Sequence, residues 1–366
     1  MIADCIIVGG GIIGLLTAHE LAQAGQKVVI LERGEIGREA SWAGGGILSP
    51  LHPWQTPLPV HALIHWSQAH YPRLAEELVS STGVDPEWIR SGLLIFDTEH
   101  RHEALAWADK TGEAIEYIDR DRLEEIDPGA AISPSRALWL PEVAQIRNPR
   151  LLKALAISLA RMDVDLCEHT EVHSLICREN RAEGVSTAKG IFAAGSVVIA
   201  AGAWSSALLH DIRCRPEIKP VRGQMLLYRT APGFLQCIVL RGDCYLVPRQ
   251  DGHLLVGSTV EHVGFDKSIT EEARLRLEAE ARRIIPGLAN YTVVRQWAGL
   301  RPGSSRRIPF IGPHPEIKNL YVNSGHFRNG VAAGLGSARL LADLMLARTP
   351  IVPPHPFTWK DQFTSH

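Results

Sequence analysis

The chain has 366 residues, of which 45% are hydrophobic and 21% charged, so it can bury more than one domain's worth of core. With 38 basic and 40 acidic residues, its net charge of −2 gives no electrostatic basis for binding nucleic acid or an anionic membrane surface. The first residues lack the basic start and cleavage site of a secretory signal, and Cys5 falls in an apolar run rather than a C-x-x-C pair. We therefore expect a cytoplasmic protein with reduced cysteines.

The chain opens with the pattern of a strand, a helix and a second strand. Cys5 to Val8 is a short apolar run bounded by glycine, which predicts a buried strand. The residues from Ile12 to Ala22 give a broad apolar face, which predicts a helix that Gly25 ends. Lys27 to Leu31 is apolar again after its first residue. This order within about 30 residues predicts a parallel βαβ unit.

Three glycines at the first turn of this unit indicate the kind of ligand that it binds. Gly9, Gly11 and Gly14 satisfy G-x-G-x-x-G, and Glu32 follows 18 residues after the last of them. Such glycines allow a tight turn, the approach of a pyrophosphate to the backbone, and close packing of helix on strand. The acid at the end of the second strand suits ribose hydroxyls and repels a 2′-phosphate, which disfavours NADP. The spacing predicts a dinucleotide site and leaves FAD and NAD open.

The remaining elements follow in chain order. A second glycine cluster at 37–50 is suited to lie against a flat ligand. Helices are predicted over 58–81, from about residue 100, over 147–162 and over 268–285, the last opened by a capping box of Ser268 and Glu271. A strand-rich region begins at 88–96. Residues 216–265 alternate as β-strands, with a hairpin turn at Asp251-Gly252.

Two glycine-containing segments repeat the parallel-strand pattern later in the chain. Residues 191–209 carry no charge, but glycines and serines interrupt them, so we expect a buried strand and a glycine turn there and no membrane span. Residues 320–345 read as strand, glycine turn and helix. We therefore predict an α/β fold in which a Rossmann-like dinucleotide domain is interleaved with an antiparallel β-sheet substrate domain. The predicted dinucleotide domain comprises 1–83, 145–215 and 296–366, and the substrate domain comprises 84–144 and 216–295.

Five segments together resemble a known family. "IIVGGGIIGLLTAHELAQAGQKVVILER", "EASWAGGGILSP", "VVIAAGAWS", "GLRPGSSRRIPFIGP" and "GHFRNGV" resemble the FAD-dependent D-amino acid oxidase family, and within it the glycine oxidases of thiazole (thiamine) biosynthesis. The resemblance runs through nearly the whole chain and keeps the order of the segments. It implies FAD as the cofactor. Relatives that bind flavin covalently use a cysteine in the C-terminal segment, and none follows Cys244 here, so noncovalent FAD is expected.

The resemblance also implies a set of cofactor residues from distant parts of the chain. Residues 32–33 are expected near the adenosine ribose, and Ser41, Gly45 and Gly46 near the pyrophosphate and the isoalloxazine. Segment 325–331, with a helix beginning near Gly330, is expected to face the flavin. The full implied set is Gly9, Gly11, Ile12, Ile13, Gly14, Glu32, Arg33, Ser41, Gly45, Gly46, Val172, Ala201, Gly202, Arg301, His326, Arg328, Asn329, Gly330 and Val331.

For the substrate, the resemblance implies Arg301 in "GLRPGS" as the carboxylate anchor. A guanidinium binds a carboxylate through two parallel hydrogen bonds. Tyr245 in "DCYLVPR" matches the second carboxylate contact, and Arg328 is a lower-ranked contact near flavin or substrate. No metal site is expected, because the spacing in "EHRHE" (99–103) does not support one.

The implied reaction is oxidation of glycine and other small amines, such as sarcosine and small D-amino acids. The products are the α-keto acid, ammonia and hydrogen peroxide, with molecular oxygen as the second substrate and no catalytic base required. By resemblance we also expect a homo-oligomer, either dimer or tetramer. Alternatives are a D-amino acid dehydrogenase or a sarcosine oxidase-like flavoenzyme that passes electrons to another acceptor. A NAD-dependent dehydrogenase, a flavin redox sensor and a tRNA-modifying oxidoreductase also stay open.

Overall fold

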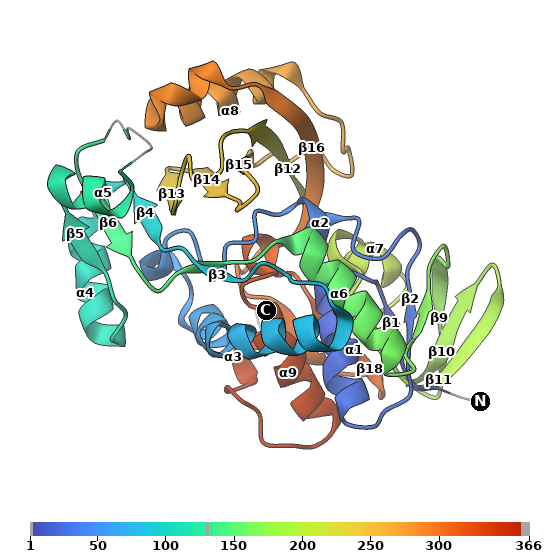
Figure 1. Cartoon of the computed structure of the whole chain (residues 1–366). Coiled ribbons are helices and arrows are strands. Elements are labelled where there is room, and N and C mark those ends of the chain that lie inside the picture. The colour runs from blue at the N-terminus through green and yellow to red at the C-terminus, as the bar shows by residue number, and fades with distance from the viewer. Residues whose placement is uncertain (1–2, 129–131, 133, 360–366) are drawn as a thin grey trace.

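The structure is a computed structural model that describes residues 3–128, 132 and 134–359. These residues form two eight-stranded sheets and a two-stranded ribbon of β3 (Ile89–Arg90) and β7 (Ala144–Gln145). The chain passes between the two sheets several times, and Figure 1 shows them as separate bodies with the C-terminal strands and helix in the lower one. The arrangement is the mixed α/β fold that the sequence predicts.

The first sheet brings together the strands predicted at the start, middle and end of the chain. Its order is β17 (Phe310–Pro313), β18 (Leu320–Ser324), β11 (Gly190–Ile199), β1 (Ala3–Val8), β2 (Val28–Leu31) and β8 (Asp165–Cys167), and β9 (Val172–Arg178) and β10 (Arg181–Thr187) extend it from β11. β1 pairs in parallel with β2 on one side and with β11 on the other, and β11 pairs in parallel with β18. The turns that follow β1, β11 and β18 therefore meet at one edge of the sheet.

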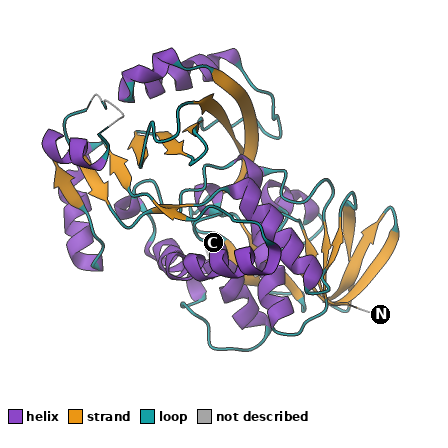
Figure 2. Ribbon diagram, viewed as in Figure 1, coloured by secondary structure: helices purple, strands orange, loops and turns teal. Residues whose placement is uncertain are grey.

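Four helices lie on one side of this sheet. They are α1 (Ile12–Gln23), α3 (Leu58–Thr82), α6 (Asn148–Arg161) and α9 (Gly334–Met345), and they group together beside β1 in Figures 1 and 2. Three of them contact its strands, and α3 packs on α6 and α9. α1 is buried from Ile12 to Leu21 because α6 and α9 contact it from two sides. Its C-terminal turn contains Gly25 at φ +80°, as predicted. The other face packs Ile6, Val8 and Leu31 against the β9–β10 hairpin.

The second sheet is largely antiparallel. Its order is β16 (Val293–Ser304), β12 (Ile218–Arg229), β15 (His253–Gly257), β14 (Cys244–Pro248), β13 (Ile238–Arg241), β4 (Leu93–Ile95), β6 (Ala137–Leu140) and β5 (Glu116–Ile118). α8 (Glu271–Ile284) covers it at the top of Figure 1, and α4 (Arg101–Thr111) and α5 (Arg120–Ile126) flank the β5 end. The hairpin between β14 and β15 turns at Gly252, with φ +81°, as predicted.

Short helices complete the connections. They are α2 (Ala40–Ala43) and α7 (Ser205–Leu208), with 3-10 turns η1 (Pro53–Gln55), η2 (Thr98–His100), η3 (Gly202–Trp204), η4 (Pro286–Asn290), η5 (Phe327–Asn329) and η6 (His355–Phe357). Every strand of the first sheet falls within the three segments predicted for the dinucleotide domain, and the second sheet comes from the other two, except that β16 crosses the boundary at 296. The division into domains itself stays a prediction.

Two predicted helix starts are wrong. The capping box of Ser268 and Glu271 does not form, because α8 begins at Glu271 and its N-cap is Thr270, whose hydroxyl accepts a hydrogen bond from Ala273 N–H at 3.3 Å. Ser268 instead donates its hydroxyl hydrogen to Asp266. The C-terminal helix begins at Gly334 and not near Gly330, because η5 and an irregular turn come first.

The charge-free stretch at 191–209 is strand β11, a glycine turn and α7. Within the described ranges, no helix combines the length and the apolar character needed to cross a bilayer.

Candidate cofactor and substrate site

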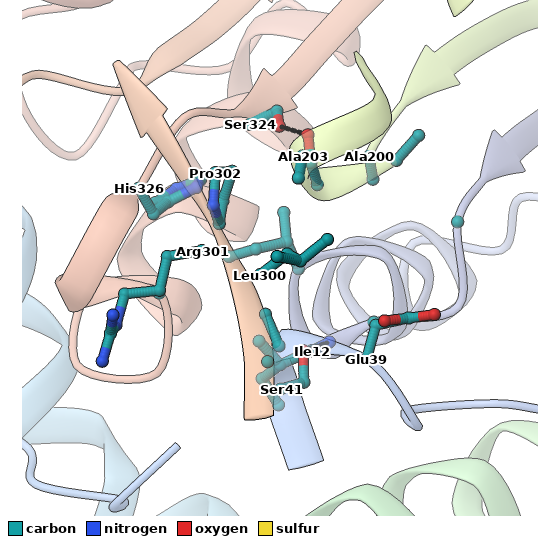
Figure 3. A pocket seen from close by; sticks show the side chains of 18 of the residues that line it. Ile12, Glu39, Ser41, Ala200, Ala203, Leu300, Arg301, Pro302, Ser324 and His326 are labelled. Atoms are coloured by element: carbon teal, nitrogen blue, oxygen red, sulfur yellow. Dashed lines mark hydrogen bonds between the residues drawn. The ribbon is translucent and has the colours of Figure 1, made fainter. Parts of the chain in front are cut away.

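A cavity of about 580 Å³ lies where the turns of the first sheet meet β12, β14 and β16 of the second. Every residue predicted for cofactor or substrate contributes to its lining, with the exception of Gly14. Figure 3 shows residues of the α1 start, the turn after β11, β16 and the turn after β18 around it. Four sequence-distant segments therefore meet at one cavity, as the parallel pairing of β1, β11 and β18 requires.

The first turn has the geometry that a pyrophosphate needs. Gly9 has φ +112°, and a Cβ there would lie 2.5 Å from the Ala200 carbonyl oxygen. A Cβ on Gly14 would lie 2.0 Å from the Gly9 oxygen, so Gly14 serves helix–strand packing and does not reach the cavity. Gly11 is the N-cap of α1 and provides no side-chain cap. The first turn of α1 therefore presents backbone N–H groups and the positive end of the helix to the cavity.

Glu32 binds the backbone of this turn as well as lining the cavity. Its carboxylate accepts hydrogen bonds from Gly10 N–H at 2.8 Å and from Gly34 N–H at 2.9 Å. Each carboxylate oxygen keeps a lone pair for a further donor such as a ribose hydroxyl. The neighbouring Arg33 lies over the Trp204 ring, 3.7 Å from its centroid, and bonds Glu39 at 3.1 Å. This end of the cavity is thus a polar recess beside a flat aromatic wall.

Hydrogen bonds from Asn148 and Arg249 hold the backbone of the second glycine cluster, at 37–50. Gly46 has φ +74°, and a Cβ there would lie 1.9 Å from the Ile146 oxygen. Asn148 donates to the Ser41 and Gly44 carbonyls at 2.8 and 3.1 Å, and Arg249 donates to the Gly45 carbonyl at 2.8 Å. Burial lowers the pKa of Arg249 to about 10. Sequence analysis missed both side chains, because neither lines the cavity and each acts through the backbone of the loop.

The turn after β18 is fixed by α3 and α9. Buried His326 has its Nε2 2.9 Å from the Ser337 hydroxyl, and burial lowers the pKa of this imidazole to about 3, so it is neutral at ordinary pH. The hydroxyl of Tyr71 donates to the Val331 carbonyl at 2.5 Å. Arg328 forms an ion pair with Asp243, in the turn between β13 and β14. These contacts hold residues 326–331 against the cavity.

Arg301 extends from β16 away from Ile12 and Ser41 (Figure 3). Three of its five N–H groups are occupied by oxygens of the protein: two on Nη1 by the Thr259 and Arg222 carbonyls at 3.0 and 3.4 Å, and one on Nη2 by the Ser258 hydroxyl at 2.7 Å. No carbonyl or acidic oxygen of the described residues accepts from the other two N–H groups, and the Tyr245 hydroxyl lies within hydrogen-bonding reach of the guanidinium.

Arg301 is also a cation without an acidic partner. Among the described residues it forms no salt bridge, and burial lowers the pKa of its guanidinium. A cation withdrawn from water is costly unless an anion meets it. The site is therefore suited to an anion that can accept two parallel hydrogen bonds.

Tyr245 lies on β14 and lines the same cavity. Its hydroxyl donates to the Met225 sulfur at 3.3 Å. A Cβ on Gly45 would lie 2.8 Å from the Tyr245 ring, so the ring packs directly on the backbone of the second glycine cluster. Met225 and Ser258 also line the cavity and were missed, because nothing in their local sequence marks them.

Comparison with known proteins agrees with this geometry. Residues 4–344 match the family described as FAD dependent oxidoreductase, abbreviated DAO. The chain belongs to this family. It is therefore a flavin-dependent oxidoreductase enzyme, and FAD is the cofactor that the family implies.

Its relatives within the DAO family include glycine oxidases. The chain is 47% identical to the glycine oxidase of Pseudomonas aeruginosa over 353 residues, covering 96% of this chain and 97% of that one. It is 45% identical to the glycine oxidase of Pseudomonas putida, with 98% of each covered. The crystal structure of glycine oxidase from Geobacillus kaustophilus superposes with a TM-score of 0.93 at 31% identity, covering 99% of both chains. These relatives confirm the predicted family and fold class.

Proposed function

We propose that this enzyme oxidises glycine and other small amino acids, such as sarcosine and small D-amino acids. Oxygen and water are consumed, and the α-keto acid, ammonia (or, from sarcosine, methylamine) and hydrogen peroxide are formed. One observation carries the substrate class: Arg301 is a cation that faces the cavity, has no acidic partner in the described chain and keeps two N–H groups, beside the Tyr245 hydroxyl, that no described carbonyl or acid accepts. A substrate carboxylate satisfies both the charge and the two donors.

The cavity residues fit FAD. Residues 9–13 and 32–33 would hold the pyrophosphate and the adenosine ribose, since they supply the positive end of α1 and the acidic acceptor Glu32. Residues 41–46, 201–202 and 326–331 would surround the flavin ring, where small side chains leave room for a flat group. FAD, when bound, supplies a two-electron acceptor. We propose noncovalent binding, because the described lining contains no cysteine.

The protein's own contribution is orientation. Arg301 and Tyr245 would hold the carboxylate from two different strands, β16 and β14, which fixes the α-carbon on the side of the cavity that residues 45 and 46 line. Rigid positioning of this kind is a large part of catalysis when the cofactor performs the chemistry. His326 stays uncharged because it is buried, so it adds no competing cation to the carboxylate site.

The proposal is tested by the visible spectrum of the purified holoprotein. Anaerobic glycine is expected to bleach the yellow flavin band. Methylamine, which lacks the carboxylate, is expected to leave it unchanged at the same concentration. Readmitted air is expected to restore the colour with one hydrogen peroxide per flavin. If only larger D-amino acids bleach the band, the substrate assignment is wrong and the reaction class stands. A failure of every amino acid to bleach it would contradict the proposal.

A further inference from the structure

Gly223 lies directly beneath the Arg301 guanidinium. A Cβ on Gly223 would lie 2.1 Å from Nη2 and 2.3 Å from both Cζ and Nη1 of Arg301. These distances are far inside van der Waals contact, so the flat face of the guanidinium rests on the Gly223 backbone. Both residues line the cavity, and neighbouring β12 and β16 bring them together.

The backbone itself does not require glycine at this position. Gly223 lies inside β12, paired with Gly299, and it does not have the positive φ that L-residues avoid. Glycine inside a strand weakens it, because no side chain packs there, and often marks the close approach of another group. The group that approaches is the Arg301 side chain.

We infer that Gly223 is a positioning residue for the carboxylate site. Its face against Gly223 and the N–H groups bound to Ser258, Thr259 and Arg222 hold the guanidinium in one orientation, beside the Tyr245 hydroxyl. This inference rests on the proposed function. It sets the plane in which a substrate carboxylate binds, with both oxygens in the plane of the guanidinium.

The experiment compares Gly223→Ala with Gly287→Ala in the holoenzyme. Gly287 makes a matched control, because a Cβ there would lie 3.9 Å from the nearest atoms, in the Phe234 ring, and it lies outside the cavity. The probe is glycolate, which carries the carboxylate of glycine with a hydroxyl in place of the amine, and binding is followed by the change in the flavin spectrum. Steady-state KM and kcat for glycine are measured in parallel.

Gly223→Ala is expected to weaken glycolate binding and raise the glycine KM by about 10- to 150-fold, the cost of losing one charge-assisted hydrogen bond. FAD content is expected to stay at the wild-type level, and Gly287→Ala to bind glycolate as the wild type does. Adding Arg301→Lys is expected to cost far less in the Gly223→Ala background than in the wild type, because the anchor is already displaced. Equal cost in both backgrounds would overturn the inference, as would wild-type glycolate affinity in Gly223→Ala.

A stability measurement keeps the inference testable if Gly223→Ala folds poorly. Removing the guanidinium with Arg301→Ala should also remove the clash. The thermal midpoint of Arg301→Ala is therefore expected to be unchanged when Gly223→Ala is added, and a further drop would show that the methyl group clashes elsewhere. If the wild type binds no glycolate, the proposed carboxylate site is wrong. If the wild type and Gly223→Ala bind glycolate equally, the site stands and only the role given to Gly223 is wrong.

Discussion

Replacing Arg301 with lysine keeps the positive charge and removes the guanidinium, whose paired N–H donors can bind both oxygens of one carboxylate. The guanidinium has five N–H groups, three occupied by Ser258, Thr259 and Arg222, which leaves two donors beside the Tyr245 hydroxyl for a carboxylate. An ammonium on a shorter stem can offer at most one bond in that direction. The loss of one charge-assisted hydrogen bond is about 1.5–3 kcal/mol, which corresponds to roughly 10- to 150-fold in affinity.

The assay for this variant measures carboxylate binding separately from flavin binding. Glycolate is titrated into the holoprotein and followed by the flavin absorbance, and FAD content is measured after heat release. We expect Arg301→Lys to retain FAD and to bind glycolate at least 10-fold more weakly. Unchanged glycolate affinity would place the carboxylate elsewhere and refute the reasoning.

Three further predictions follow from the described contacts. Glu32→Ala removes the acceptor for the backbone N–H groups of Gly10 and Gly34. It is expected to raise the FAD dissociation constant, measured by flavin fluorescence, about 10-fold. The control Glu35→Ala, which removes only an exposed ion pair, is expected to leave that constant unchanged. Gly46→Ala combines a φ of +74° with a Cβ 1.9 Å from a carbonyl oxygen, so we expect about 2–4 kcal/mol lower stability in urea unfolding. His326 has a folded-state pKa of about 3, below its unfolded value, so protons favour the unfolded state and stability should be lost as pH falls from about 6.5 towards 3. This contribution approaches about 1.4 kcal/mol per pH unit and should be absent in His326→Gln, and parallel pH profiles of urea unfolding in both proteins would contradict it.

Local patterns were sufficient for much of the fold. The βαβ unit was predictable because each of its elements has its own local hydrophobic pattern. These elements are the strand with the apolar run at Cys5, the helix from Ile12 and the strand ending at Leu31. The hairpin at Gly252 was predictable for the same reason. The start of α8 was not predictable, because both Ser268 and Thr270 stand shortly before Glu271 and either could cap the helix. The hydroxyl of Ser268 bonds Asp266 instead, and Thr270 is the N-cap.

The candidate site divides in the same way. Residues at glycine turns, such as Gly9 and Gly46, could be predicted because a turn with positive φ requires glycine, and this shows in the local sequence. Gly223, Ser258 and Arg249 could not, because each acts on a residue far away in the chain. The pairing of β12 with β15 and β16 brings Gly223 and Ser258 to Arg301, and Arg249 reaches Gly45 across the cavity wall. Their chemistry comes from tertiary contacts.

We propose that Arg301 receives the substrate's carboxylate beside the bound flavin. The most direct measurement is a crystal structure of the holoprotein with glycolate. We expect the carboxylate oxygens within hydrogen-bond distance of the two free N–H groups of Arg301 and of the Tyr245 hydroxyl, on the cavity side of Gly223. A carboxylate bound at another residue, with Arg301 keeping only its bonds to Ser258, Thr259 and Arg222, would contradict the account.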